Sequence, residues 1–261
     1  MARSPDGPAP PPAVQRIRLQ YAKRGRLRFS SHRDFQRALE RALRRCAVPM
    51  AYSAGFSPHP RVSYAGAAPT GAASEAEYLE IALARRCDAE QIRAALDTAL
   101  PAGFDVVRAV EADGPNLPDR LQASVWRIEL HGAGPEVADA VQVLMKADRV
   151  EVQRMTKSGM RTFDARNAIV SLAVDLPEAS STASACAILQ LVVRHTTPAV
   201  RPDDILTALH VVADFAPPSS PLMTRLAQGP LDESNGSVAD PLATEDGRSK
   251  TASAGSNGLA N

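Results

Sequence analysis

The residues best suited to chemistry lie in the first quarter of the sequence, around two histidines. His32 follows two serines at the predicted start of a helix, and His59 stands between Pro58 and Pro60, which restrict the backbone on both sides. An imidazole titrates near neutral pH, so two of them beside a phosphate could act as general base and general acid in metal-independent cleavage of RNA. The alternative is that His32 completes a helix cap and His59 braces its loop.

Arginines follow His32 along the same predicted helix and could bind phosphate. Their spacing of three or four residues places them along one side of a helix, and the planar guanidinium group suits bidentate phosphate contact. The predicted nucleic-acid-binding residues are Arg33, Arg37, Arg41, Arg44, Arg45 and Arg61 in this region, and Lys157, Arg161 and Arg166 in a later segment. The alternative is that the arginines form a solvated helix face.

The later segment, TKSGMRTFDAR, reads as a hairpin-like basic loop. Gly159 lets its backbone turn closely, and Lys157, Arg161 and Arg166 could extend a phosphate-binding surface. We expect Asp164 to pair with a neighbouring arginine. A plain turn is the alternative.

The charge of the chain is strongly segregated along the sequence. Twelve lysines and arginines stand against two carboxylates between Val14 and Val62, a balance of +10 in a chain whose formal net charge is +1. Such segregation favours an anionic partner, and RNA is the partner we expect, although basic segments can also face an acidic surface of the same protein. Phe56 and Tyr64 flank the His59 loop and could stack on unpaired bases.

Other kinds of site are not predicted. Cys46, Cys87 and Cys186 show no C-x-x-C spacing, and the sequence contains no H-E-x-x-H or G-x-S-x-G motif. We therefore expect no metal and no cofactor, and we take the scattered His131, His195 and His210 as structural. The sequence leaves open whether any reaction is catalysed.

No membrane segment or signal peptide is predicted. No apolar run reaches the roughly 18 residues of a membrane span, and the N-terminus lacks an apolar core. We expect a cytoplasmic protein.

The elements that must position the candidate residues follow from hydrophobic periodicity. Ile17, Leu19 and Tyr21 alternate with polar residues and predict a half-buried strand. Ser31 and Asp34 form an S-x-x-D capping pattern at the start of the arginine-bearing helix. Its apolar face consists of Phe35, Ala38, Leu39, Ala42, Leu43 and Cys46, and Pro49 ends it.

A similar pattern restarts in the second half of the chain. Trp126, Ile128 and Leu130 alternate, PEVADAVQVLMKA is helical, Pro202 suits a first helical position, and a last strand is expected at VVADF. We predict an α+β protein of two tandem ferredoxin-like (βαββαβ) halves with antiparallel sheets, at residues 14–113 and 114–215. Residues 1–13 and 216–261 should be disordered tails. A single sheet with insertions is the alternative.

Three stretches of the sequence resemble the radical SAM-linked protein family, known by a domain of unknown function numbered 2344. They are LRFSSHRDFQRALERALRRCAVPMAYSAGFSPHPRVSYAGAAPTGAASEAEYLEIAL, RMTKSGMRTFDARNAIVSL and VRPDDIL, so the resemblance spans roughly Ile17 to Phe215. It implies a protein either fused behind a radical SAM protein or separate from one, with no established activity. We expect the separate kind, because the cluster ligands C-x-x-x-C-x-x-C are absent and radical chemistry would belong to another protein.

Three functions follow as expectations. The first is an RNA-binding accessory factor in RNA processing or modification. The second is a protein-interaction or substrate-presenting module for a separate radical SAM enzyme, in which the arginines meet an acidic protein surface. The third is a metal-independent ribonuclease that uses His32 and His59.

Overall fold

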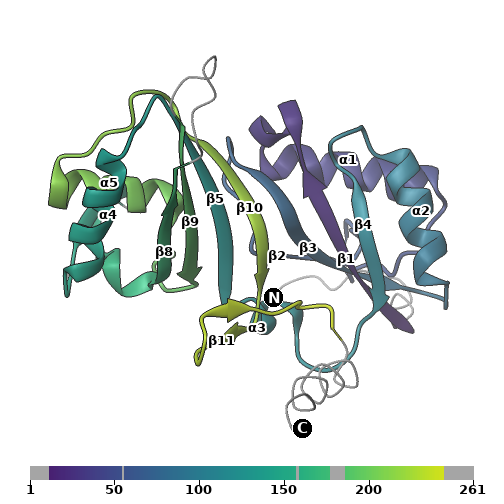
Figure 1. Cartoon of the computed structure of the whole chain (residues 1–261). Helices are drawn as coiled ribbons and strands as arrows, with labels where there is room; N and C mark the ends of the chain where they lie inside the picture. The colour runs from purple at the N-terminus through teal and green to yellow at the C-terminus, as the bar shows by residue number, and fades with distance from the viewer. Residues whose placement is uncertain (1–11, 55, 157–158, 177–185, 244–261) are drawn as a thin grey trace, which may run out of the picture. The chain divides into compact units, whose positions relative to one another are not determined.

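The computed structural model of this protein describes residues 12–54, 56–156, 159–176 and 186–243. Within these ranges it is an α+β protein with five α-helices and an eight-stranded, mostly antiparallel sheet (Figure 1). The hydrogen-bonded strands follow the order β4-β1-β3-β10-β5-β9-β8, and β2 pairs with β3. The chain divides into two compact units, of residues 1–67, 77–120 and 240–261 in the first and 68–76 and 121–239 in the second.

The first unit holds the candidate histidines and the basic helix. Its elements are β1 (Gln15–Lys23), α1 (His32–Arg45), β2 (Val62–Ala65), β3 (Ala73–Leu83, from Glu77 on), α2 (Ala89–Ala99), β4 (Val106–Glu111) and the short α3 (Leu117–Arg120). Strand β1 alternates as predicted: Ile17, Leu19 and Tyr21 are buried in one core with α1 and α2. The two helices therefore cover one face of this part of the sheet, and Arg16, Arg18 and Gln20 lie on the other.

Helix α1 forms where the sequence predicts it and is capped as predicted. The Ser31 side chain accepts a hydrogen bond from the Asp34 backbone N–H at 3.2 Å, and Asp34 Oδ2 accepts from the Ser31 N–H at 3.0 Å. The predicted apolar face is confirmed by the burial of its residues from Phe35 to Leu43. The helix ends at Arg45, and Ala47 then turns the chain with a φ of +49°.

The second unit contains two α-helices and, besides its strands of the large sheet, two small two-stranded sheets. Its elements are β5 (Ala123–His131), α4 (Glu136–Lys146), β6 (Glu151–Thr156), β7 (Gly159–Asp164), β8 (Ile169–Asp175), β9 (Cys186–Arg194), α5 (Pro202–Ala213), β10 (Leu222–Gly229), β11 (Leu231–Asp232) and β12 (Ser237–Val238). Strand β5 is antiparallel to both β9 and β10. Trp126, Ile128 and Leu130 are buried in a core with α4 and α5, so the alternation predicted for β5 is confirmed.

The predicted disordered tail from residue 216 is wrong over its first part, because β10 is an interior strand. It pairs with β5 on one side and with Ala73 and Ser74 of β3 on the other. The polar residues of β10 made its sequence look like an exposed tail, but Arg225 and Gln228 are buried. Arg225 donates to Ser74 Oγ at 3.2 Å, and Gln228 donates to the Ala76 carbonyl at 2.6 Å. The composition of a segment does not show whether its polar residues are buried with hydrogen-bonding partners.

Two further predictions of the second half need correction. The expected strand VVADF does not form, because its first residues continue α5 to Ala213 and Asp214 ends the helix with a φ of +50°. The predicted division at residue 113 also differs from the observed one: Arg120 of the first unit donates to the Pro241 carbonyl at 2.7 Å, and Arg108 pairs with Asp240. Residues 1–11 and 244–261 lie outside the described ranges.

No helix in the described ranges combines the length and the apolar character that a membrane crossing requires.

A candidate nucleic-acid interface on helix α1

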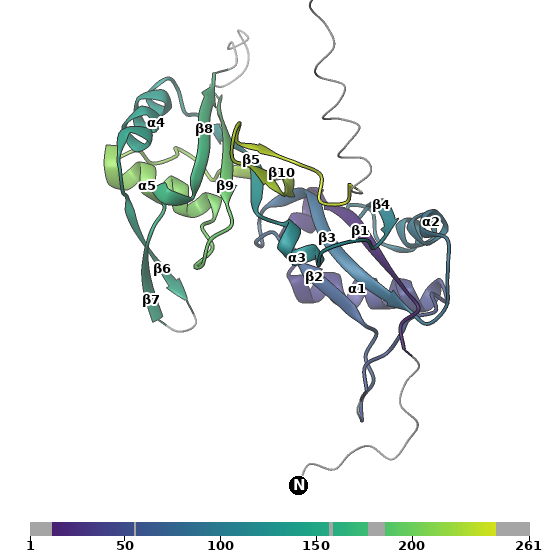
Figure 2. The ribbon, with the colours of Figure 1, turned by 90° about the horizontal axis from the view of Figure 1, so that it is seen from below.

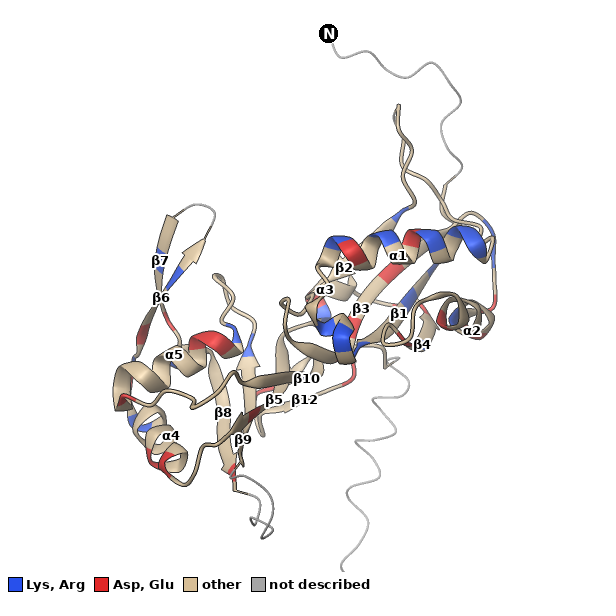
Figure 3. Ribbon diagram, turned by 90° about the horizontal axis from the view of Figure 1, so that it is seen from above, with Lys and Arg blue, Asp and Glu red and all other residues tan. Residues whose placement is uncertain are grey.

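One side of α1 carries four arginines, which we call the α1 arginine face: Arg33, Arg37, Arg41 and Arg44. All four are exposed, and at about 100° per residue they fall within one arc opposite the buried residues Leu39 and Ala42. From Arg33 to Arg44 the face extends about 16 Å along the helix axis. Figure 3 shows basic positions along the whole of α1.

The α1 arginine face is nearly free of acidic partners. Arg33, Arg41 and Arg44 form no ion pair with any described residue. Hydrogen bonds from Ser31 hold the pKa of Asp34 below its usual value, and the charge of Arg37 lowers it further. The flanking Arg45 donates to the Ala99 carbonyl of α2 at 3.2 Å, so it ties the two helices together.

Three arginines of β1 and the residues just after it pair with carboxylates of the first unit. Arg18, 3% exposed, donates to Glu80 Oε2 at 3.1 Å and to the Asp113 and Pro115 carbonyls. Arg16 lies 3.6 Å from Glu80 Oε1, and Arg24 donates to Asp105 Oδ2 at 2.8 Å. The sequence charge of +10 is thus partly offset by Glu80 and Asp105, whereas the arginines of α1 stay exposed.

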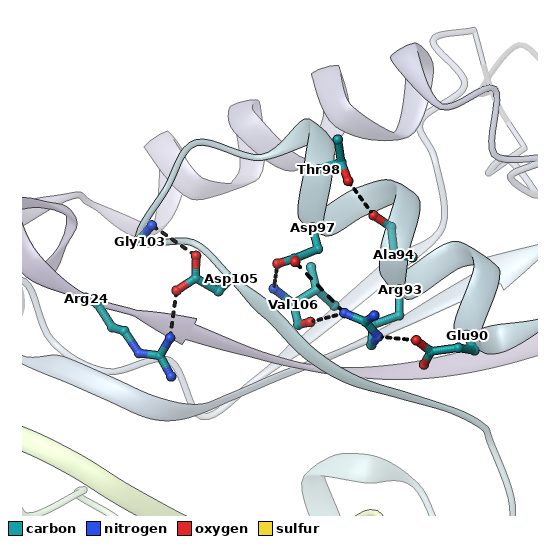
Figure 4. A network of polar contacts seen from close by, with 9 residues as sticks. All are labelled: Arg24, Glu90, Arg93, Ala94, Asp97, Thr98, Gly103, Asp105 and Val106. Carbon is teal, nitrogen blue, oxygen red and sulfur yellow. Dashed lines mark hydrogen bonds and ion pairs between the residues drawn. The ribbon is translucent and has the colours of Figure 1, made fainter.

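A network of polar contacts links α2 to Val106 of β4 (Figure 4). Asp97 accepts from the Val106 N–H at 2.8 Å, and Arg93 donates to the Val106 carbonyl at 3.2 Å and to Glu90 at 2.7 Å. Gly103 has a φ of +98°, and a Cβ there would lie 3.0 Å from the Arg24 carbonyl. The acidic side chains of α2 are thus engaged locally.

The two candidate catalytic histidines make separate contacts. The His32 ring lies edge-on to Tyr64, with 4.7 Å between centroids, and its Nε2 is 3.1 Å from Gln36 Nε2. Burial raises the pKa of the Tyr64 hydroxyl above its usual value. The exposed His59 meets Ser53, whose Oγ accepts from the His59 N–H at 3.1 Å. Among the described residues no recorded contact joins the two imidazoles.

The loop between α1 and β2 projects from the first unit (Figure 2), and His59 belongs to it by its position in the sequence. Backbone bonds close the loop like a hairpin: Ser53 N–H donates to the His59 carbonyl at 2.9 Å, and Arg61 N–H donates to Ala51 at 2.8 Å. The loop exposes 73% of Phe56 and 42% of Tyr52. Tyr21 and Phe35, in contrast, are buried and stacked as predicted for core aromatics.

A hollow of about 240 Å³ joins the α1 arginine face to this loop. It is lined by Arg44 and Glu40 of α1 and by Tyr52 and Pro60 of the loop, among others. A guanidinium group and a partly exposed aromatic ring therefore border the same depression. Phosphate contact and base stacking could both take place there.

Another hollow of the first unit lies between the short helix α3 and the sheet face opposite α1 and α2. It has a volume of about 490 Å³, and its polar lining consists of Arg16, Arg61, Ser63, Glu80, Asn116 and Asp119. Of these the sequence predicts only Arg61 as a binding residue. Arg61 is exposed and forms no ion pair with a described residue.

The predicted basic segment of the second unit is a hairpin, β6–β7, in which Arg161 is exposed and lies opposite Arg154. Arg166 is half-buried and donates to the Met145 carbonyl at 3.2 Å, which is a structural contact. The prediction for Asp164 is wrong: its Oδ1 accepts backbone N–H groups of Val150 and Arg166, both at 3.0 Å. Lys157 lies outside the described residues.

Comparisons with known proteins identify the sequence family. A family model described as "Uncharacterized protein conserved in bacteria (DUF2344)" matches residues 16–202. No curated protein matches the chain. Among solved structures, the chain is similar to one titled "Crystal Structure of an Unknown Protein from Galdieria sulphuraria", with 14% identity and a TM-score of 0.23 over 81% of this chain and 96% of that chain.

Proposed function

The chain belongs to the DUF2344 family of uncharacterized proteins conserved in bacteria, and we propose that it acts as an RNA-binding accessory factor in RNA processing or modification. The α1 arginine face carries the proposal: four exposed guanidinium groups on one helix side, with no carboxylate bridging Arg33, Arg41 or Arg44 among the described residues. A row of unneutralised guanidinium groups suits a row of phosphates.

Single-stranded RNA is the form of nucleic acid that this surface fits best. Unpaired bases stack on aromatic side chains while cations follow the backbone. Tyr52 shares a hollow with Arg44, and Phe56 is exposed at the loop beyond it. The proposed path therefore runs along α1 and ends on the loop between α1 and β2.

The test is filter binding of unstructured and structured RNA at several salt concentrations. Each phosphate contact to a single strand lowers the slope of log K against log salt by about 0.7, so four contacts predict a slope of about −3. Absence of binding, or an affinity insensitive to salt, would contradict the proposal.

A protein-docking function is the second candidate, and the 73% exposure of Phe56 favours it, because a large exposed ring beside arginines also suits a protein interface. The partner would be a separate radical SAM enzyme, for which this chain presents substrate. Co-purification with nuclease treatment separates the two candidates: a protein partner survives the treatment and an RNA-mediated one is lost. Cytoplasmic location stays part of both proposals.

We also propose that both units are ferredoxin-like. The order β1-α1-β2-β3-α2-β4 with the pairing β4-β1-β3-β2 supports this for the first unit. For the second, β5, β8, β9 and β10 pair in the corresponding order β10-β5-β9-β8, with α4 and α5 as the two crossovers. The hairpin β6–β7 is then an insertion before β8. An experimental structure of the full chain tests this assignment.

A further inference from the structure

A cluster of three metal-binding residue types lies on the sheet of the second unit. Glu129 and His131 stand two residues apart on β5, and Cys186 is the first residue of β9. The register pairs His131 directly with Cys186. One oxygen, one ring nitrogen and the sulfur of these side chains lie within 4.8 Å of one another.

The alternation of β5 explains why these side chains meet. Ile128 and Leu130 point into the core beneath α4 and α5, so Glu129 and His131 point to the opposite face. Cys186 precedes the buried Ala187 and shares that opposite face. Glu129 and Cys186 are half-buried and His131 is exposed, which leaves the cluster open to solvent on one side.

The ligand atoms are largely uncommitted. The ring of His131 and the carboxylate of Glu129 accept no hydrogen bond from any described residue, and Cys186 Sγ has only a weak contact of 3.9 Å with the Ala187 carbonyl. The His131 backbone is held separately, because its carbonyl accepts from Ser219 Oγ at 2.8 Å. Binding a cation would therefore break no strong interaction.

Arg127 is the charged neighbour that the cluster must accommodate. Its Nε lies 3.4 Å from Glu129 Oε1, yet this buried nitrogen forms no hydrogen bond with any described residue. One carboxylate oxygen can thus face Arg127 while the other faces the cluster. Groups that hold a metal-binding carboxylate in this way orient it from outside the coordination sphere.

We propose that Glu129, His131 and Cys186 bind a divalent cation of the zinc class, with a fourth coordination position open to solvent. A thiolate, an imidazole and a carboxylate together suit Zn²⁺, whereas Mg²⁺ and Ca²⁺ prefer oxygen ligands and Cu(I) prefers sulfur. Tetrahedral zinc places its ligand atoms about 3.3–3.8 Å apart. The observed limit of 4.8 Å exceeds this spacing by about 1 Å, so the proposal requires the three ligand atoms to move closer when the cation binds.

This site goes beyond the proposed RNA binding and departs from the expectation of no metal. The spacing motifs of zinc sites place their ligands close in sequence, whereas Cys186 reaches the other two only through the pairing of β9 with β5. Because the α1 arginine face lies in the first unit, either proposal can fail without the other.

The test is titration of the untagged full-length protein with Co²⁺, followed by displacement with Zn²⁺. We expect one equivalent to bind with a thiolate-to-cobalt charge-transfer absorption. C186S should abolish that absorption, and H131A and E129Q should each weaken binding at least tenfold. C87S and H210N are matched controls outside the cluster and should leave the titration unchanged, and circular dichroism reports whether each variant folds.

Two outcomes would overturn the proposal. One is the absence of a charge-transfer absorption from the folded full-length protein. The other is an absorption that persists in folded C186S, which would place the thiolate ligand at Cys46 or Cys87.

Discussion

Strand β1 and helix α1 are neighbours in sequence and both carry arginines, but the surroundings of these arginines differ. Strand β1 places Arg18 on a sheet face, beside Glu80 of β3 and under the carbonyls of Asp113 and Pro115. Helix α1 turns its arginines away from the core, where no strand or helix of the described residues supplies a carboxylate to Arg33, Arg41 or Arg44. The net charge of a sequence segment therefore predicts the electrostatic field at the surface only when the neighbours of each cation are known.

The largest effect expected from this comparison is on stability. R18A removes a buried guanidinium group, leaving half-buried Glu80 with only the longer contact to Arg16 and the Asp113 and Pro115 carbonyls without this donor. Breaking such a buried pair costs about 3–5 kcal/mol. R41A removes an exposed guanidinium group and should change stability by at most about 0.5 kcal/mol. Urea unfolding of both variants measures the difference, and equal stabilities would show that the two sets of cations are equivalent.

The next effect is on RNA affinity. The variant R37Q/R41Q/R44Q should shift the salt slope by about 2 and weaken binding at low salt strongly, because three phosphate contacts are lost. The control R86Q/R149Q/R194Q removes the same charge from arginines that already pair with Glu111, Glu151 and Glu233. If both triple variants bind equally, total charge and not the α1 arginine face determines affinity.

A smaller effect on affinity is expected from the loop. Y52A removes the ring that shares a hollow with Arg44, and loss of one stacked base costs about 1–3 kcal/mol of binding free energy. The salt slope should stay unchanged, because no cation is removed. A changed slope with unchanged affinity in filter binding would contradict stacking at this position.

The helix cap gives a smaller effect still, on stability. S31A should cost about 1 kcal/mol by removing the cap of α1. The pKa of Asp34 is lowered from its ordinary 3.8 in the folded protein, so its contribution is present above that value and is lost as pH falls through the folded pKa. The stability difference between the parent and D34N, measured by urea unfolding, should therefore shrink below about pH 4. A difference that grows on acidification would contradict the cap.

The smallest expected effect is that of the histidines on RNA affinity. H32A and H59A should bind RNA nearly as well as the parent, because neither removes a permanent cation. If the protein cleaves RNA, the nuclease hypothesis requires that each substitution abolish cleavage. Retained cleavage in either variant, measured on labelled RNA, would dismiss it.

Local patterns predicted much of the first unit. The apolar spacing from Phe35 to Leu43 and the Ser31–Asp34 pair were sufficient for α1, because helix period and capping are properties of adjacent residues. The same reasoning missed β10, whose Arg225 and Gln228 are buried against Ser74 and Ala76. A buried polar residue is recognised only by its partner, and these partners lie about 150 residues away in sequence.

The features of the candidate sites also fall into two groups, those that depend on local sequence and those that depend on the tertiary structure. The sequence by itself determined which residues form α1, how the helix is capped and that its arginines share one side, because each of these depends on neighbours within a few positions. Only the tertiary structure decided which cations are neutralised, that Arg44 and Tyr52 border one hollow, and that Glu129, His131 and Cys186 meet. Strand pairing brings together residues that are distant in sequence, and no local pattern encodes that pairing.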